Sequence, residues 1–203
     1  MNYTGDVLHF GLATEKARAL GLNVEMVVVG DDVGVGREKS GKVGRRGIAG
    51  TVLVHKIAGA LAATGAGLSE TAELARLVAA NLVTLGSALE HVHVPGTAGM
   101  KEGGLEPNEI ELGMGIHNER GCKRMEIPQV SELVNAMLMQ LLDRSDTDRN
   151  YLDVSGHGEW VLMINNLGGV SPLELGGIAA EVVEQLCMLS PMWLALCSET
   201  DHQ

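Results

Sequence analysis

Apolar positions along the chain follow two spacings, one typical of helices and one typical of strands. Helical spacing predicts helices over residues 6–20, 48–62, 69–85, 129–142 and 172–186. Short β-branched or alternating runs predict strands over residues 24–29, 89–94, 110–116 and 160–164. Strands that alternate with helices along the chain indicate an α/β fold, with mixed or parallel sheets flanked by helices.

The start of the last predicted helix carries a local signal of its own. Ser171 stands three positions before Glu174, the spacing of a capping box in which each residue bonds the other's backbone. Pro172 lies between them at the first helical position, where its missing N–H costs nothing.

Composition limits what the chain does. Its 203 residues are enough for one domain or two small lobes, and 45% of them are hydrophobic, although only 2% are aromatic. Aliphatic side chains must therefore fill the core. The formal net charge of -11 argues against nucleic-acid binding, which requires a basic face.

The cysteines and the apolar runs indicate in which cellular compartment the protein lies. The three cysteines form no CxxC pair, and the segment MNYTGDVLHF lacks the pattern of a signal peptide. The apolar run from Leu186 to Cys197 is interrupted by Ser190 and Pro191 and is too short to span a bilayer. We expect a cytoplasmic protein without a membrane partner.

Two segments near the N-terminus are candidate sites. NYTGD (residues 2–6) delivers Asp6 to the start of a helix, where a carboxylate either caps the helix or serves a site. GREKSGKV (residues 36–43) imitates a phosphate loop but has Val43 where a hydroxyl must bind magnesium. We interpret it as an exposed charged loop, followed by Arg45 and Arg46 at a domain seam, in solvent or beside an anion.

The segment GMGIHNE (residues 113–119) presents His117 after a glycine-flanked strand. A neutral imidazole there is a competent nucleophile toward a carbonyl, an acid, a base or a metal ligand, although such a histidine is more often structural. Glu119 either orients the ring or lies in solvent. His91 and His93 share one strand face, but no further residue completes a metal site with them.

Several of these segments occur together and in order in one known family. NYTGD, EMVVVGDD (25–32), GRRGIAGTVLVHKIAGA (44–60), ELGMGIH (111–117) and INNLGGVSPLELG (164–176) resemble the substrate-binding domain of dihydroxyacetone kinases. The similarity is to the ATP-dependent enzymes of eukaryotes in particular, and it extends from Asn2 to about Leu186.

INNLGG (164–169) is a further candidate site. It joins a predicted strand to a predicted helix, and such a connection either lines a binding cleft in an α/β sheet or forms only a turn.

The resemblance implies a function and its residues. The histidine at position 117 would bind the ketone of dihydroxyacetone covalently as a hemiaminal, and Asp6 would act as acid or base beside the substrate hydroxyls. ATP and Mg²⁺ would be held by a separate nucleotide-binding domain, for phosphorylation to dihydroxyacetone phosphate. The family is usually homodimeric.

The resemblance also implies a domain organisation. We expect residues 1–86 to form the C-terminal part of a first lobe, residues 87–186 the N-terminal part of a second, and residues 187–203 a divergent tail. The chain is expected to be truncated at both ends, because the family has a glycine-rich Ser-Gly-His segment before NYTGD and a lysine where Met1 stands. The alternative is an inactive module that retains binding or dimerisation.

Overall fold

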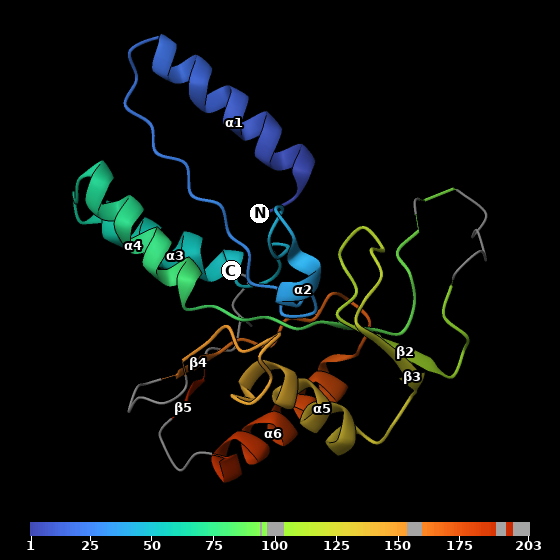
Figure 1. The fold of residues 1–203 in the computed structure, drawn as a ribbon. Coiled ribbons are helices and arrows are strands. Elements are labelled where there is room, and N and C mark those ends of the chain that lie inside the picture. The colour runs from blue at the N-terminus through green and yellow to red at the C-terminus, as the bar shows by residue number, and fades with distance from the viewer. Residues whose placement is uncertain (94, 97–103, 154–159, 190–193, 197–203) are drawn as a thin grey trace.

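The structure, a computed structural model, describes residues 1–93, 95–96, 104–153 and 160–189, and the backbone of 194–196 (Figure 1). Its elements, in chain order, are α1 (Thr4–Ala19), α2 (Arg37–Ser40), α3 (Thr51–Ala63), α4 (Leu68–Ala80), β1 (Ser87–Ala88), β2 (Glu109–Leu112), β3 (Lys123–Glu126), α5 (Val130–Leu142), β4 (Trp160–Leu162), α6 (Pro172–Leu189) and β5 (Leu194–Leu196). Helices interleave with strands, and the predicted α/β class is confirmed.

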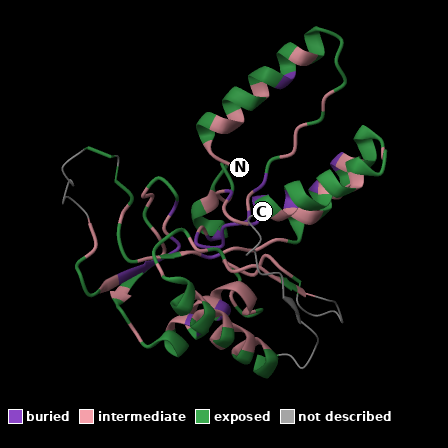
Figure 2. Cartoon of the chain, turned by 180° about the vertical axis from the view of Figure 1, so that it is seen from behind, coloured by how far each residue is buried: buried purple, intermediate pink, exposed green. Residues whose placement is uncertain are grey.

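Helix α1 stands away from the rest of the chain, to which it returns through the extended segment 20–30 (Figure 1). Only Thr14 of α1 is buried, and most of the helix surface is exposed (Figure 2). Lys16 and Arg18 in its last turn and Asp6 in its first turn complement the helix dipole. Local sequence, more than packing, therefore defines this helix.

The predicted strand over 24–29 is wrong in this structure, although the segment is extended. Its side chains alternate as in a strand, since Val27 and Val29 pack toward α3 and α4 while Val28 is exposed. No strand pairs with it among the described residues. Arg18 binds the carbonyl of Val24, and the backbone N–H of Asn2 donates to Val29 O at 2.9 Å. A strand requires a ladder, which a β-branched run alone does not provide.

Helices α3 and α4 form a hairpin over this segment. Val29, Val54 and Ala75 are the buried centre of the cluster, surrounded by partly buried side chains of Val27, Ala58, Val78, Ala79 and Leu82. The small residues on both helices allow this close packing. Helix α4 ends at Ala80, sooner than the predicted Leu85. Thr84 bonds the chain after the extended segment instead, since its N–H donates to Asp31 O at 2.8 Å and its carbonyl accepts from the N–H of Val33 at 2.9 Å.

The carboxylate of Asp31, fully buried, joins three segments. It accepts hydrogen bonds from the backbone N–H groups of Ile48 (2.7 Å) and Gly50 (2.8 Å), before α3, and from the Thr84 hydroxyl. These donors satisfy a charge that would otherwise be costly to bury. Asp31 thus fixes the start of α3 against the chain that leads to β1.

Strands β1, β2 and β3 form an antiparallel sheet in that order. The β2–β3 register pairs Glu111 with Arg124, whose side chains form an ion pair of 2.9 Å across the strands. Glu111 is 1% exposed and also accepts a hydrogen bond from the N–H of Gly121. The polar sequence of β3 (KRME) explains why periodicity did not predict this strand.

The remaining predicted elements are shorter or paired differently. The strand over 89–94 is wrong for residues 89–93, because β1 ends at Ala88, and residue 94 lies outside the described residues. Strand β4 lies parallel to β5, which the sequence pattern did not predict. The described residues thus form one antiparallel sheet and one parallel sheet, and neither sheet is mixed.

Helices α5 and α6 pack against each other, and Gln185 of α6 donates to the carbonyl of Ser131 at 2.9 Å. The capping box before α6 is confirmed. The N–H of Ser171 donates to the Glu174 carboxylate at 2.7 Å, and the N–H of Glu174 donates to the Ser171 hydroxyl at 3.3 Å. None of the described helices combines the length and hydropathy needed to cross a bilayer.

Candidate functional site

His117 lies in the loop of the β2–β3 hairpin, residues 113–122. The loop is closed at its base where the N–H of Cys122 donates to Leu112 O at 2.8 Å. Gly113 ends β2 in the left-handed region, with φ of 71°, so the strand is shorter than the predicted 110–116. His117 therefore follows a turn rather than a strand end, and two rigid strands hold that turn.

Glu119 holds the imidazole of His117. One carboxylate oxygen accepts the backbone N–H of His117 at 2.9 Å, and the other lies 3.0 Å from Nδ1. The contact with the carboxylate favours the tautomer that carries its proton on Nδ1. Nε2 then has a free lone pair, and no hydrogen bond engages it within the described part of the chain. The His117 side chain is 62% exposed, so this nitrogen is accessible.

The environment of Glu119 keeps it ionised. Partial burial raises the pKa of its carboxyl group, but hydrogen bonds from the backbone N–H of His117 and of Glu119 itself, and then the imidazole, outweigh this effect. The pKa of Glu119 consequently lies below its ordinary value. Glu119 is therefore an acceptor for the Nδ1 proton at neutral pH.

Tyr3 brings the NYTGD segment to this loop. Its ring meets the imidazole of His117 at right angles, with centroids 4.8 Å apart and planes at 87°. The hydroxyl is shielded from solvent beside the backbone of Ile116, without reaching hydrogen-bond geometry. Burial, and then the charge of Glu119, raise the pKa of Tyr3, so the phenol remains neutral.

Asp6 lies in the first turn of α1, half-buried, three positions after Tyr3, which occupies the N-cap position. The N-cap residue is therefore Tyr3 and not Asp6, and the Tyr3 side chain makes no capping hydrogen bond to the described helix. Asn2 anchors the segment, because its side-chain amide donates to the carbonyls of Val43 (2.8 Å) and Arg45 (2.6 Å). Asp6 and His117 thus come from segments that meet through Tyr3.

The charged loop before α3 divides into two parts. Most of residues 37–43 are exposed, as expected, and four of them form the single turn α2. Arg37 and Arg45 place their guanidinium groups over the ring of Tyr151, at 4.2 and 4.0 Å from its centroid. Arg46 binds Asp32 and the carbonyl of Gly113, so its guanidinium group is held by other parts of the chain.

Asn118 connects the hairpin loop to a further segment. Its φ is 63°, a left-handed conformation that asparagine tolerates better than most residues. Its side-chain amide both donates to Val92 O and accepts from the N–H of Val92, each at 2.9 Å. The amide thus bonds both backbone groups of Val92, as a residue of a paired strand would, so residues 91–93 lie beside the His117 loop.

The other candidates do not join this site. Asn166 closes INNLGG as a turn, by accepting from the N–H of Gly168 and donating to Val170 O, each at 2.8 Å. His93 lies 3.3 Å from Glu90 at the surface. Within the described ranges, no group of three or more His, Cys, Asp or Glu side chains is placed to hold a metal ion. With Val43 in the imitation phosphate loop, these residues do not fit a Mg²⁺–ATP site.

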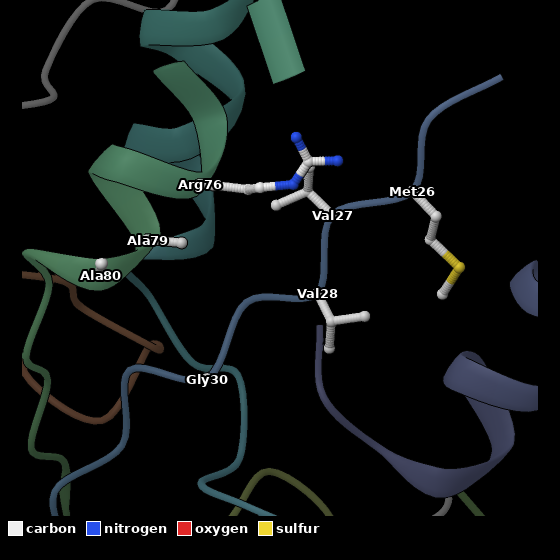
Figure 3. A pocket seen from close by; sticks show the side chains of 7 residues that line it. All are labelled: Met26, Val27, Val28, Gly30, Arg76, Ala79 and Ala80. Carbon is white, nitrogen blue, oxygen red and sulfur yellow. The ribbon is translucent and has the colours of Figure 1, made fainter. Parts of the chain in front are cut away.

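A cavity lies beside the extended segment, and no residue of the His117 loop is among those that line it (Figure 3). It is lined by Met26, Val27, Val28, Gly30, Arg76, Ala79 and Ala80. Arg76 is its charged residue and forms an ion pair of 2.6 Å with Glu25. Its walls carry no nucleophile and no acid, so the candidate chemistry lies at the hairpin loop.

Sequence reasoning missed the roles of Tyr3 and Asp32. Tyr3 lies within a quoted motif, but nothing in its spacing indicates contact with a residue so distant along the chain. Asp32 is fully buried beside Asp31. The two consecutive carboxylates that follow the apolar run by one residue could have indicated this role, because a carboxylate next to a buried segment requires a partner.

Comparisons with known proteins agree with this geometry. Residues 1–190 match the Dak1 domain family. The chain belongs to the Dak1 domain family. It is 54% identical to a dihydroxyacetone kinase of Pichia angusta over 198 residues, which cover 91% of this chain and 32% of that protein. The resemblance to dihydroxyacetone kinases is therefore confirmed.

Solved structures of Dak1 relatives share the fold. The native dihydroxyacetone kinase of C. freundii superposes with a TM-score of 0.80 at 39% identity, covering 98% of this chain and 34% of that one. The same kinase in complex with AMP-PNP and Mg²⁺ superposes with a TM-score of 0.77 at 41% identity, covering 95% and 33%. This Dak1 chain spans about a third of the length of these relatives.

Proposed function

We propose that this chain is the substrate-binding part of a dihydroxyacetone kinase and captures dihydroxyacetone through His117. The observation that carries the proposal is the contact of Glu119 with Nδ1, which leaves Nε2 of His117 free and exposed. A ketone accepts attack by such a nitrogen, whereas glycerol has no carbonyl group and does not. Covalent capture therefore both selects the substrate and fixes its orientation.

The bonding changes balance as a simple addition. The lone pair of Nε2 attacks the ketone carbon, a C–N bond forms, and the C=O π bond becomes an alkoxide. The imidazole loses its Nδ1 proton to Glu119 or through it to water, and the alkoxide gains one proton from water. The product is a neutral hemiaminal, and its formation requires a neutral imidazole at the start.

We assign Asp6 the role of proton acceptor from the substrate's terminal hydroxyl. Its position in the first turn of α1, three residues after Tyr3, whose ring contacts His117, supports this role. A carboxylate near that hydroxyl increases its nucleophilicity toward a phosphoryl group. ATP and Mg²⁺, used by relatives, would be bound by another part of the enzyme, in the cytoplasm, and a homodimer is the expected assembly.

The test uses dihydroxyacetone labelled with ¹³C at the ketone carbon. We expect a tetrahedral-carbon NMR signal on binding to the full chain, with loss of this signal in His117→Ala. His9→Ala is the matched control, since His9 is an exposed histidine on α1. Labelled glycerol should give no new signal. Absence of the signal in the unchanged protein, or its persistence in His117→Ala, would contradict the proposal.

A further inference from the structure

Two guanidinium nitrogens of Arg46 form hydrogen bonds at the base of the His117 loop, and the third faces the loop. Nε lies 2.6 Å from a carboxylate oxygen of Asp32, and Nη2 donates to the carbonyl of Gly113 at 2.6 Å. The third nitrogen, Nη1, faces Gly115, where a Cβ atom would stand 2.6 Å from it and would overlap the Glu119 carboxylate. One planar group thus contacts the two glycines that lead to His117.

Asp32 makes the position of Arg46 rigid. The carboxylate of Asp32 is fully buried, and its second oxygen accepts the N–H of Gly34 at 2.8 Å. The Arg46 side chain is 13% exposed, so the ion pair is largely shielded from water. The backbone also joins them, because the N–H of Asp32 donates to Arg46 O at 3.1 Å. Because both side chains of this ion pair are held by further bonds, the pair can keep the His117 loop in one position.

The same guanidinium group faces the carboxylate that orients the nucleophile. Nη1 of Arg46 and Oε2 of Glu119 both lie against Gly115, which has no side chain to separate them. That oxygen also accepts the backbone N–H of His117. The bond of Arg46 to the carbonyl of Gly113 fixes the start of the loop that carries this carboxylate.

We propose that Arg46 is a positioning residue for covalent capture, which with Asp32 behind it holds Glu119 and the loop so that His117 presents Nε2 to the ketone. This inference rests on the proposed function of His117. A lysine cannot replace this arginine, because an ammonium group lacks the planar fork that reaches Asp32 and Gly113 together. Displacing a reactive group by about 1 Å can reduce its efficiency by roughly 100-fold.

The test compares Arg46→Gln and Arg46→Lys with Arg120→Gln. Arg120 lies in the same loop, is exposed, and makes no ion pair among the described residues, so its loss changes the net charge equally. We expect the affinity for ¹³C-labelled dihydroxyacetone to fall about tenfold or more in both Arg46 variants. Arg120→Gln should leave the affinity unchanged.

A second measurement separates positioning from a purely structural role. ¹⁵N NMR of His117 without ketone reports which ring nitrogen carries the proton, and the Nδ1–H form should lose population in Arg46→Gln. Asp32→Asn, which weakens the ion pair but keeps the guanidinium group, should shift the population in the same direction. If an Arg46 variant does not fold, Asp32→Asn alone decides the outcome.

Two results would overturn the inference. One is a lower melting temperature in the Arg46 variants with unchanged tautomer and unchanged ketone affinity, which would make Arg46 structural only. The other is an equal effect of Arg120→Gln, which would make the effect one of net charge. If the unchanged protein forms no hemiaminal, the proposed function fails, but the tautomer shift still tests the positioning by Arg46.

Discussion

The ring of Tyr3 meets the imidazole of His117 at right angles, with their centroids 4.8 Å apart. This contact joins the N-terminal segment to the hairpin loop, two parts of the chain with no sequence proximity. Tyr3 and Glu119 together leave the imidazole little freedom to rotate. The site therefore depends on a contact between two segments that lie far apart along the chain.

Tyr3→Phe is expected to preserve hemiaminal formation, and Tyr3→Leu is expected to weaken it. The hydroxyl has no hydrogen-bond partner among the described residues, so its removal should change the free energy of unfolding by less than about 1 kcal/mol. Loss of the ring removes an edge-to-face contact worth about 0.5–1.5 kcal/mol, so ketone affinity should fall roughly 2- to 10-fold. Titration with ¹³C-labelled dihydroxyacetone measures both variants. Equal affinities would show that the ring contact does not orient His117.

The carboxyl group of Glu119 is expected to titrate below the ordinary value of 4.5 in the unchanged protein. A lowered folded-state pKa means that its contribution to stability is fully present above the unfolded-state pKa. That contribution is lost as the pH falls through the folded-state pKa. ¹³C NMR of the labelled carboxyl group gives the titration directly.

His117→Ala tests the cause of this shift. Because the backbone N–H at position 117 remains, the pKa of Glu119 should move only part of the way back toward its ordinary value. A complete return would mean that the imidazole alone lowers the pKa. No movement would mean that the imidazole does not contact Glu119 in solution.

Gly34→Ala should destabilise the protein, because the backbones of residues 34 and 113 touch. A Cβ atom at position 34 would stand 2.8 Å from the Cα of Gly113 and 2.9 Å from a carboxylate oxygen of Asp32. We expect a loss of about 1–3 kcal/mol in the free energy of unfolding, measured by urea denaturation.

Gly59→Ala is the matched control for this substitution. Gly59 lies inside α3, and its Cβ position is empty out to 4 Å. Alanine there should stabilise the protein by about 0.5–1 kcal/mol, because it lowers the entropy lost when the helix forms. A loss of stability at Gly59 comparable to that at Gly34 would contradict the crowding argument.

Asp31→Ala should be among the most destabilising single changes. It leaves the N–H groups of Ile48 and Gly50 and the hydroxyl of Thr84 without their acceptor, inside the protein. We expect a loss of about 3 kcal/mol or more by urea denaturation. Thr84→Val removes one donor and should cost about 1 kcal/mol. Similar losses in both variants would show that the bonds to α3 contribute little.

The sequence by itself determined the five long helices to within a few residues, the family and the candidate nucleophile. Helical spacing and the Ser171–Glu174 box act within a few residues, so they are readable without the rest of the fold. The order of the motifs led to the Dak1 family and to His117. The sequence also offered the role of Glu119 as one of two alternatives, because Glu119 lies only two positions after His117.

Only the tertiary structure decided which strands form and what surrounds His117. Strands depend on partners: Val24–Val29 remains extended without a ladder, whereas the polar segment Lys123–Glu126 is a strand because β2 pairs with it. In the same way, Tyr3 and Arg46 reach His117 and its loop through contacts between distant segments. Local pattern specifies what a segment can become, while pairing and burial of charge between segments determine the site that they form.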